Sequence, residues 1–148
     1  MQSQYDGGLR TPLMVRWPAK IRPAMSHTVV SSVDILPTLL EAVGIARPEG
    51  IPGVSLTDSA ALAARKAVFG ECFTHNSKDL ANPSASLRWR WVIQDDWKLI
   101  IPAAQNESDA KAELYNLKAD PHEEKNLAGE QVDRVGIMRA VLDGWWKG

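Results

Sequence analysis

The chain has 148 residues, of which 45% are hydrophobic and 24% charged, a composition typical of one globular domain with room for a sizeable core. Its net charge of −1 excludes attraction to nucleic acid or to an anionic membrane through overall charge. The single cysteine, Cys72, excludes an internal disulfide and a thiolate zinc cluster.

The first part of the chain predicts a strand followed by a helix. Residues 11–17 form a short apolar run between turn residues, which is typical of a buried strand. A helix is expected over about 35–43, with Asp34 as its N-cap and Gly44 as its C-terminal stop. Its apolar side chains recur at helical spacing and need a neighbouring element to cover them: Leu36, Leu39, Leu40 and Val43.

Residues 46–64 indicate a loop followed by a weak helical turn, because prolines and glycines precede a run of alanines. We place a domain boundary here, which divides the chain into residues 1–64 and 65–148. The second part predicts strands at 67–74, 87–94, 97–101 and 113–117 and a last helix at about 130–146. The sequence therefore predicts an α+β unit, an antiparallel sheet of about four strands with one C-terminal helix packed on it.

The strand over residues 87–94 alternates apolar and basic side chains. Trp89 and Trp91 share a face with Leu87 and Ile93, and we expect this face to be core. Arg88 and Arg90, with Lys98 of the next strand, are expected to project from one face of the hairpin. This basic cluster is a candidate for binding a sulfated sugar, although basic residues on the wet face of a sheet are usual.

Three stretches resemble the sulfatase family, in the order and place expected for the closing third of such an enzyme. They are Tyr5-Asp-Gly-Gly-Leu-Arg-Thr-Pro-Leu-Met-Val-Arg-Trp-Pro18, Val30-Ser-Ser-Val-Asp-Ile-Leu-Pro-Thr-Leu-Leu40 and Glu113-Leu-Tyr-Asn-Leu-Lys-Ala-Asp-Pro-His-Glu-Glu-Lys-Asn-Leu-Ala128. The resemblance is to arylsulfatase-like and N-sulfoglucosamine sulfohydrolase-like members. It implies an alkaline-phosphatase-like fold, of which residues 1–64 supply a strand and a helix of the large α/β domain and residues 65–148 the C-terminal subdomain.

The resemblance also implies a chemistry whose main parts this chain lacks. Sulfatases use a formylglycine, made from the first residue of a Cys/Ser-x-Pro-Ser-Arg motif, and a divalent cation, usually calcium, held by Asp and Asn side chains. Cys72 is followed by Phe73, Thr74 and His75, which does not match that motif. The family's lysine, four residues before the tyrosine of the first stretch, falls on Met1. We therefore name no catalytic residue and no metal ligand in this chain.

Three residues are candidates for substrate contact. Arg10 matches the family's arginine after the glycine pair. For its side chain we favour hydrogen bonds to backbone carbonyls around the turn over direct contact with sulfate. His75 and Asn76 begin a long polar loop after a strand, and loops of this subdomain border the substrate pocket in the family. The alternative for His75 is a solvated loop histidine.

The sequence thus predicts the C-terminal portion of a sulfatase that hydrolyses sulfate esters or sulfamates, with sulfated carbohydrate as the expected partner and no nucleic acid or membrane. The chain alone is expected to be inactive, to scaffold and border the pocket, and to self-associate. The alternative is a stand-alone, non-catalytic module that binds sulfated glycans. The compartment stays open, because family members are often periplasmic, secreted or lysosomal.

Overall fold

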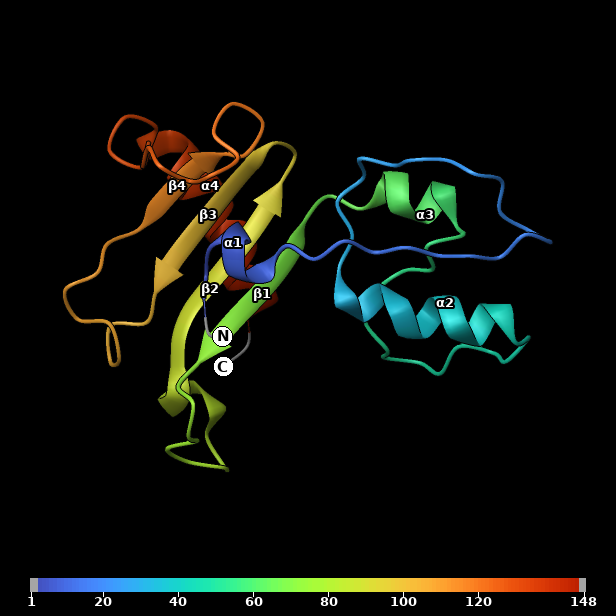
Figure 1. The fold of residues 1–148 in the computed structure, drawn as a ribbon. Helices are drawn as coiled ribbons and strands as arrows, with labels where there is room; N and C mark the ends of the chain where they lie inside the picture. Colours follow the sequence, from blue (N-terminus) through green and yellow to red (C-terminus); the bar gives the residue numbers. More distant parts are fainter. Residues whose placement is uncertain (1–2, 147–148) are drawn as a thin grey trace. The chain divides into compact units, whose positions relative to one another are not determined.

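The computed structural model describes residues 3–146, which form two compact units (Figure 1). One unit spans Leu13–Val68, and the other joins the described residues up to Pro12 with those from Phe69 onward. The expected boundary after residue 64 lies close to this division, but the chain before Leu13 packs with the second half. The assignment of residues 1–64 to a catalytic domain stays a prediction. No helix among the described residues is long and apolar enough to cross a membrane.

The Leu13–Val68 unit contains the 3₁₀ turn η1 (Ser32–Asp34) and the helices α2 (Ile35–Ala42) and α3 (Ser59–Ala64). The predicted helix and its stop are confirmed, because Gly44 has φ +74° and the Ile45 amide donates to the Leu40 carbonyl at 2.9 Å. The predicted strand at residues 11–17 is wrong. These residues are extended but lie in no sheet, since the described chain supplies no strand to pair with them.

Asp34 is the central polar residue of this unit. It precedes α2 as predicted, but its side chain does not cap that helix. The fully buried carboxylate instead accepts hydrogen bonds from the amides of Ser31 and Val54 and from the Arg65 guanidinium, at 2.7–2.9 Å. Burial alone would raise the pKa of Asp34, but these hydrogen bonds outweigh it and hold the pKa below its usual range.

The second unit is built on a four-stranded antiparallel sheet in the order β1-β2-β3-β4. Its elements are α1 (Asp6–Leu9), β1 (Val68–Phe73), η2 (Pro83–Ser86), β2 (Leu87–Gln94), β3 (Trp97–Pro102), β4 (Glu113–Asn116) and α4 (Val132–Trp145). The Asp95-Asp96 turn closes the predicted hairpin, with Gln94 opposite Trp97 and Asp95 at φ +52°.

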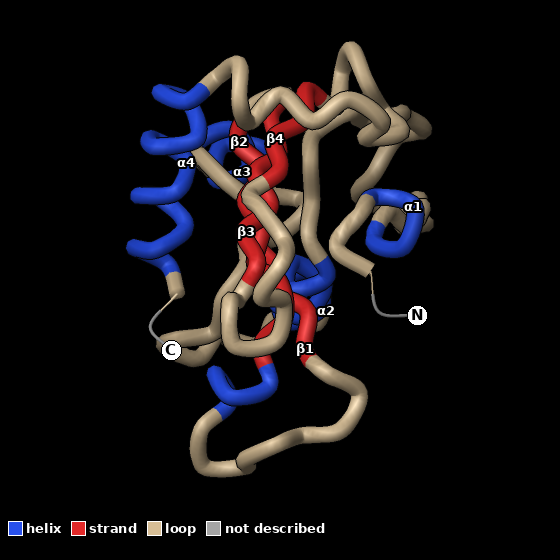
Figure 2. Tube along the Cα trace, turned by 90° about the vertical axis from the view of Figure 1, so that its left-hand side faces the viewer, coloured by secondary structure: helices blue, strands red, loops and turns tan. Residues whose placement is uncertain are grey.

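The two faces of the sheet are covered by different elements. Figure 2 shows α4 and α1 on opposite sides of it. Trp89, Trp91, Ile100 and Tyr115 form the core of one face, and Tyr5 and Leu9 from the start of the chain pack against them. The other face carries Val92 and Leu99 and packs on α4, whose buried residues are Met138 and Leu142. The prediction that the tryptophan face is core is therefore confirmed.

Truncation of Trp89 tests this core. The side chain is 6% exposed, and emptying such a site costs about 3–5 kcal/mol of unfolding free energy. We expect Trp89→Ala to lower the stability of the sheet unit by that amount in urea unfolding followed by circular dichroism. Leu80→Ala is the control, because Leu80 is 91% exposed and surface changes usually stay within about 0.5 kcal/mol. Equal stability of the two variants would contradict the packing described.

Candidate functional site

The Tyr-Asp-Gly-Gly stretch is fixed to the sheet by two groups of polar side chains. The Tyr5 hydroxyl donates to the Glu113 carboxylate of β4, with oxygen–oxygen distances of 3.0 and 3.1 Å. Next to it, the Lys98 ammonium lies 2.8 Å from Asp6 Oδ1 and 2.7 Å from Glu123 Oε1. The Asp6 amide donates to the other Glu123 oxygen at 2.5 Å. The start of the chain is thus held by both side-chain and backbone bonds.

Two tyrosines bonded to Glu113 have raised pKa values. The Tyr115 hydroxyl donates to Glu113 at 2.5 Å, and the rings of Tyr5 and Tyr115 meet edge to face at 6.4 Å. Burial and then the hydrogen bond to the Glu113 carboxylate raise the pKa of both phenols. Both tyrosines are therefore hydrogen-bond donors at neutral pH, and neither is prepared to act as a base.

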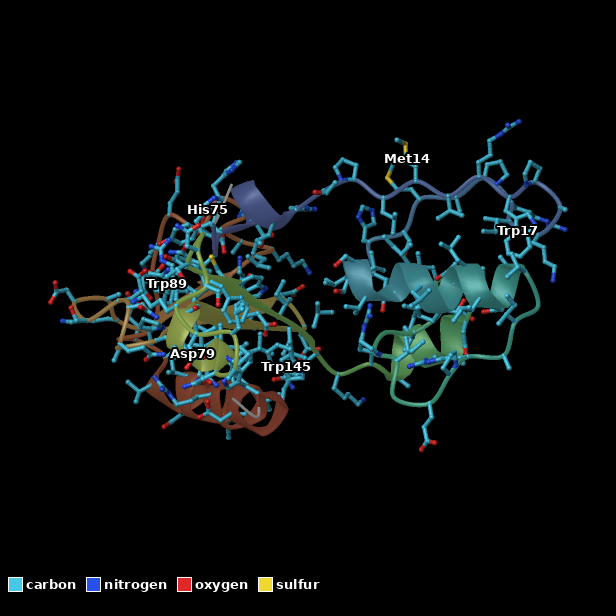
Figure 3. The ribbon with its side chains drawn as sticks, turned by 90° about the horizontal axis from the view of Figure 1, so that it is seen from below. Met14, Trp17, His75, Asp79, Trp89 and Trp145 are labelled. Carbon is cyan, nitrogen blue, oxygen red and sulfur yellow. The ribbon has the colours of Figure 1, made fainter. Side chains whose placement is uncertain are left out.

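The three predicted substrate-contact residues lie on two separate segments. His75 and Asn76 are exposed in the loop that follows β1 (His75 is labelled in Figure 3). Arg10 is exposed directly after α1. The Thr74 hydroxyl donates to the Asn76 carbonyl at 2.7 Å, which orders the start of the loop. Exposure leaves all three side chains accessible to a ligand, and their role in substrate contact stays a prediction.

Asn106 joins this loop to the one after β3. Its side-chain amide donates to the carbonyls of Ala85 and Leu87 at 3.0 and 2.6 Å, and its oxygen accepts from the Lys78 ammonium. Asn106 also begins the sequon Asn106-Glu107-Ser108. Because both amide hydrogens are bonded within the fold, Asn106 is a structural residue that fixes the border of the sheet.

The basic cluster predicted on one face of the hairpin is wrong. Lys98 lies opposite Ile93, on the tryptophan face, and is fully buried. Arg90 lies on the α4 face, where it pairs with Asp143 at 2.9 Å, and Arg88 pairs with Glu107. The three cations therefore occupy different surroundings, and each has an acidic partner. A sulfate group would have to displace those partners, so this hairpin offers no open anion site.

Other candidate groups show no catalytic arrangement. Cys72 is buried, and burial raises the pKa of its thiol, which disfavours the nucleophilic thiolate. Among residues 3–146, no group of three or more His, Cys, Asp or Glu side chains is placed to hold a metal ion. Asp120 bonds the amides of Glu124 and Lys125, as expected for a turn carboxylate.

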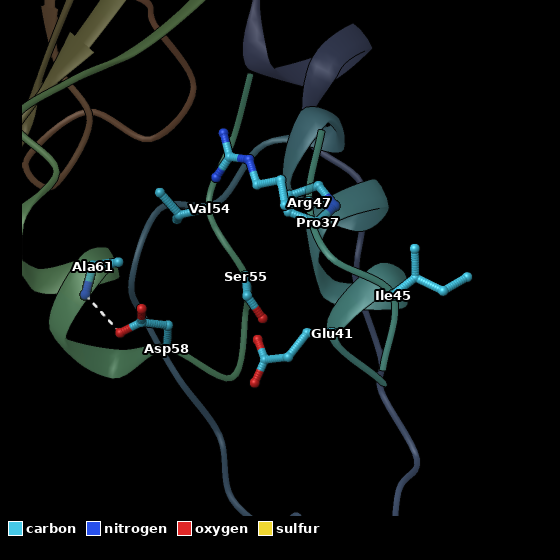
Figure 4. A pocket seen from close by; sticks show the side chains of 8 residues that line it. All are labelled: Pro37, Glu41, Ile45, Arg47, Val54, Ser55, Asp58 and Ala61. Carbon is cyan, nitrogen blue, oxygen red and sulfur yellow. Dashed lines mark hydrogen bonds between the residues drawn. The ribbon is translucent and has the colours of Figure 1, made fainter. Parts of the chain in front are cut away.

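The Leu13–Val68 unit contains an open hollow between α2 and α3 (Figure 4). Its polar groups have local tasks: Asp58 caps α3 by accepting from the Ala61 amide, and Arg47 donates to the Ile51 carbonyl. Hydrogen bonds from Ser55 and Thr57 hold the pKa of Glu41 below its usual range. Its polar side chains are thus bonded to one another or to nearby backbone.

The sequence analysis missed the polar group around Lys98. Asp6 lies about a hundred residues before Glu113 and Glu123, and no spacing rule connects it with them. One signal was available, because Asp6 and Glu123 both lie within the stretches that carried the family resemblance.

Comparison with known sequences identifies relatives along the whole chain. The family model described as N-sulphoglucosamine sulphohydrolase, C-terminal, matches residues 2–140. Arylsulfatase K of Xenopus laevis is 31% identical over 154 residues, which cover 95% of this chain and 27% of that protein. The N-acetylgalactosamine-6-O-sulfatase of Bacteroides thetaiotaomicron is 26% identical over 95% of this chain and 28% of its own length. The chain thus spans about a quarter of these relatives.

Solved structures agree with the sequence matches. A Bacteroides thetaiotaomicron protein from work on the metabolism of multiple glycosaminoglycans superposes with a TM-score of 0.68 at 25% identity, over 97% of this chain and 30% of that one. A second structure, in complex with its substrate D-glucosamine-2-N,6-O-disulfate, has a TM-score of 0.54 at 26% identity, over 75% of this chain and 22% of that one. The architecture is therefore that of the C-terminal region of sulfatases.

The tyrosine pair predicts an unusual alkaline titration. The chain has only two tyrosines, and both phenols have raised pKa values, so the folded protein should show less tyrosinate absorbance at pH about 10 than free tyrosine does. The urea-unfolded chain should titrate normally. The unfolded state loses these two protons at lower pH than the folded state. The contribution of the phenols to the free energy of unfolding is therefore fully present below pH about 10 and falls as the pH rises above it.

Replacement of the acceptor separates burial from hydrogen bonding in this titration. Glu113→Gln removes the carboxylate and should lower the midpoint of tyrosine titration, while Glu124→Gln, at an exposed position, should leave it unchanged. Normal titration of both tyrosines in the folded parent chain would contradict the arrangement.

Proposed function

The chain belongs to the sulfatase family and matches the family model of the N-sulphoglucosamine sulphohydrolase C-terminal region, and we propose that it forms the C-terminal portion of an enzyme that hydrolyses sulfate esters or sulfamates. The observation that carries this is the match over residues 2–140 to a region that makes up about a quarter of the relatives. In this proposal the chain contributes structure and part of the pocket border, while the reacting groups belong to the rest of the enzyme.

The residues of this chain do not fit the family's reacting groups. Cys72 is buried and lacks the formylglycine motif around it, and the described residues include no metal-binding cluster. We therefore assign formylglycine and calcium to the rest of the enzyme and no step of the reaction to this chain. Arg10, His75 and Asn76 are the residues that we assign to the border of the substrate pocket.

The proposed substrate is a sulfated carbohydrate. Support comes from the relatives, which include an N-acetylgalactosamine-6-O-sulfatase and an N-acetylglucosamine-6-O-sulfatase, and from the solved structure in complex with D-glucosamine-2-N,6-O-disulfate. A stand-alone glycan-binding module is less well supported, because Arg88, Arg90 and Lys98 are already paired with acidic side chains.

The apolar surface of the Leu13–Val68 unit supports a scaffolding role. Leu36, Leu39 and Val43 lie on one side of α2 and are exposed, whereas Pro37 and Thr38 are buried. In the extended segment before α2, Leu13, Met14 and Val15 are exposed too, and Met14 projects away from the chain (Figure 3). Such a surface is typical of a docking face. We propose that the remainder of the sulfatase catalytic domain covers it.

An enzyme chimera tests the proposal. The Bacteroides thetaiotaomicron N-acetylgalactosamine-6-O-sulfatase, with its matched segment replaced by this chain, should fold as a monomer and release sulfate from N-acetylgalactosamine-6-sulfate. The same enzyme truncated before that segment and this chain alone should both be inactive. A folded, monomeric chimera without activity would contradict the proposal, as would sulfate release by the chain alone.

The uncovered face of α2 also predicts self-association of the isolated chain. Polar replacement of two exposed apolar residues, in the double variant Leu39→Gln and Val43→Gln, should shift the chain from oligomer to monomer in light scattering. Ile137→Gln is the control, because this exposed residue lies on α4 in the other unit. A parent chain that is monomeric at all concentrations would show that this surface needs no cover.

A further inference from the structure

Lys98 is the fully buried charged residue of the sheet unit, as Asp34 is of the Leu13–Val68 unit. It is 0% exposed within β3, on the face of the sheet that otherwise carries Trp91, Ile100 and Tyr115. Its ammonium is bound by Asp6 from one end of the chain and Glu123 from the other. Replacing such a buried pair by apolar residues is often neutral or stabilising, so fold stability alone does not account for it.

The two acids differ in what they do. Glu123 is itself buried, with φ +57°, and uses both carboxylate oxygens, one for Lys98 and one for the Asp6 amide. Asp6 in turn opens the four-residue helix α1. The cluster therefore fixes Asp6 through its side chain and its backbone together, which defines the orientation of the segment as well as its place.

The segment held in this way is a small closed turn. The Gly8 and Leu9 amides donate to the Tyr5 carbonyl and the Arg10 amide donates to the Asp6 carbonyl, at 2.8–3.2 Å. Gly8 has no room for a side chain, because a Cβ there would lie 2.5 Å from Ser3 Cβ. The turn is thus attached at Tyr5 and Asp6, and its last residue, Arg10, is placed with it.

We propose that Lys98, acting with Glu123 through Asp6, is a positioning residue of the enzyme: it orients the Tyr5–Arg10 turn and so places Arg10 at the pocket. This inference rests on the proposed function, in which Arg10, the last residue of this turn, borders the substrate pocket. Lys98 itself touches no substrate. Its effect reaches the pocket through Asp6.

Amide hydrogen exchange of this chain tests the attachment. Asp6→Asn should accelerate exchange of the Gly8, Leu9 and Arg10 amides at least about tenfold, the ordinary scale for loss of one charge-assisted hydrogen bond, and accelerate the β2–β3 amides by a smaller factor. Lys118→Met is the control, because Lys118 is an exposed lysine, and it should leave the exchange of both sets of amides unchanged. Lys98→Met should act like Asp6→Asn; if it unfolds the sheet, Asp6→Asn decides. Equal acceleration of both sets, or none, would overturn the proposal.

The chimera tests the consequence for the site. Asp6→Asn should lower kcat at least about tenfold with KM changed less than about threefold, because orientation is lost and general binding is retained. Asp6→Glu should recover part of kcat, and Lys118→Met should match the parent. An active parent with unchanged kcat in Asp6→Asn overturns this inference only. An inactive parent contradicts the proposed function, and this inference with it.

Discussion

The buried ammonium of Lys98 is the constraint on which the sheet unit depends. A cation without solvent must be neutralised and hydrogen-bonded where it lies. Here Asp6 accepts a hydrogen bond from the ammonium, and Glu123, 117 residues further along the chain, pairs with it as a second negative charge. Their convergence places Tyr5 beside Tyr115 and closes the tryptophan face of the sheet. The first residues are therefore part of the C-terminal unit, although about sixty residues of the other unit separate them from β1.

Local sequence patterns predicted the elements of the sheet well and their pairing less well. Alternation in β2 was enough to place Trp89 and Trp91 in the core. Alternation was not enough to place Lys98, because the face on which Lys98 lies depends on the register of the β2–β3 hairpin. With Gln94 opposite Trp97, Lys98 falls opposite Ile93 on the tryptophan face, one residue out of phase with Arg90. Its acidic partners are non-local, and no periodicity could have identified them.

Asp34 shows the same limit in the other unit. A residue before a helix is ordinarily interpreted as a cap, and local reasoning stops there. The structure instead uses Asp34 to hold the Val54 amide and Arg65, which come from 20 and 31 residues further along the chain. The strand expected at residues 11–17 failed for a related reason: a strand is defined by its partner, and apolar composition alone supplies none.

The two units therefore differ in how far they satisfy their own surfaces. The sheet unit has both faces covered, by α4 on one side and by the Tyr5–Leu9 segment on the other, and its buried charges are paired. The Leu13–Val68 unit satisfies its buried polar group at Asp34 but leaves the apolar side of α2 exposed. Exposed apolar patches of this kind mark interaction surfaces. Any docking surface on the described residues is therefore more readily sought in residues 13–68 than on the covered faces of the sheet.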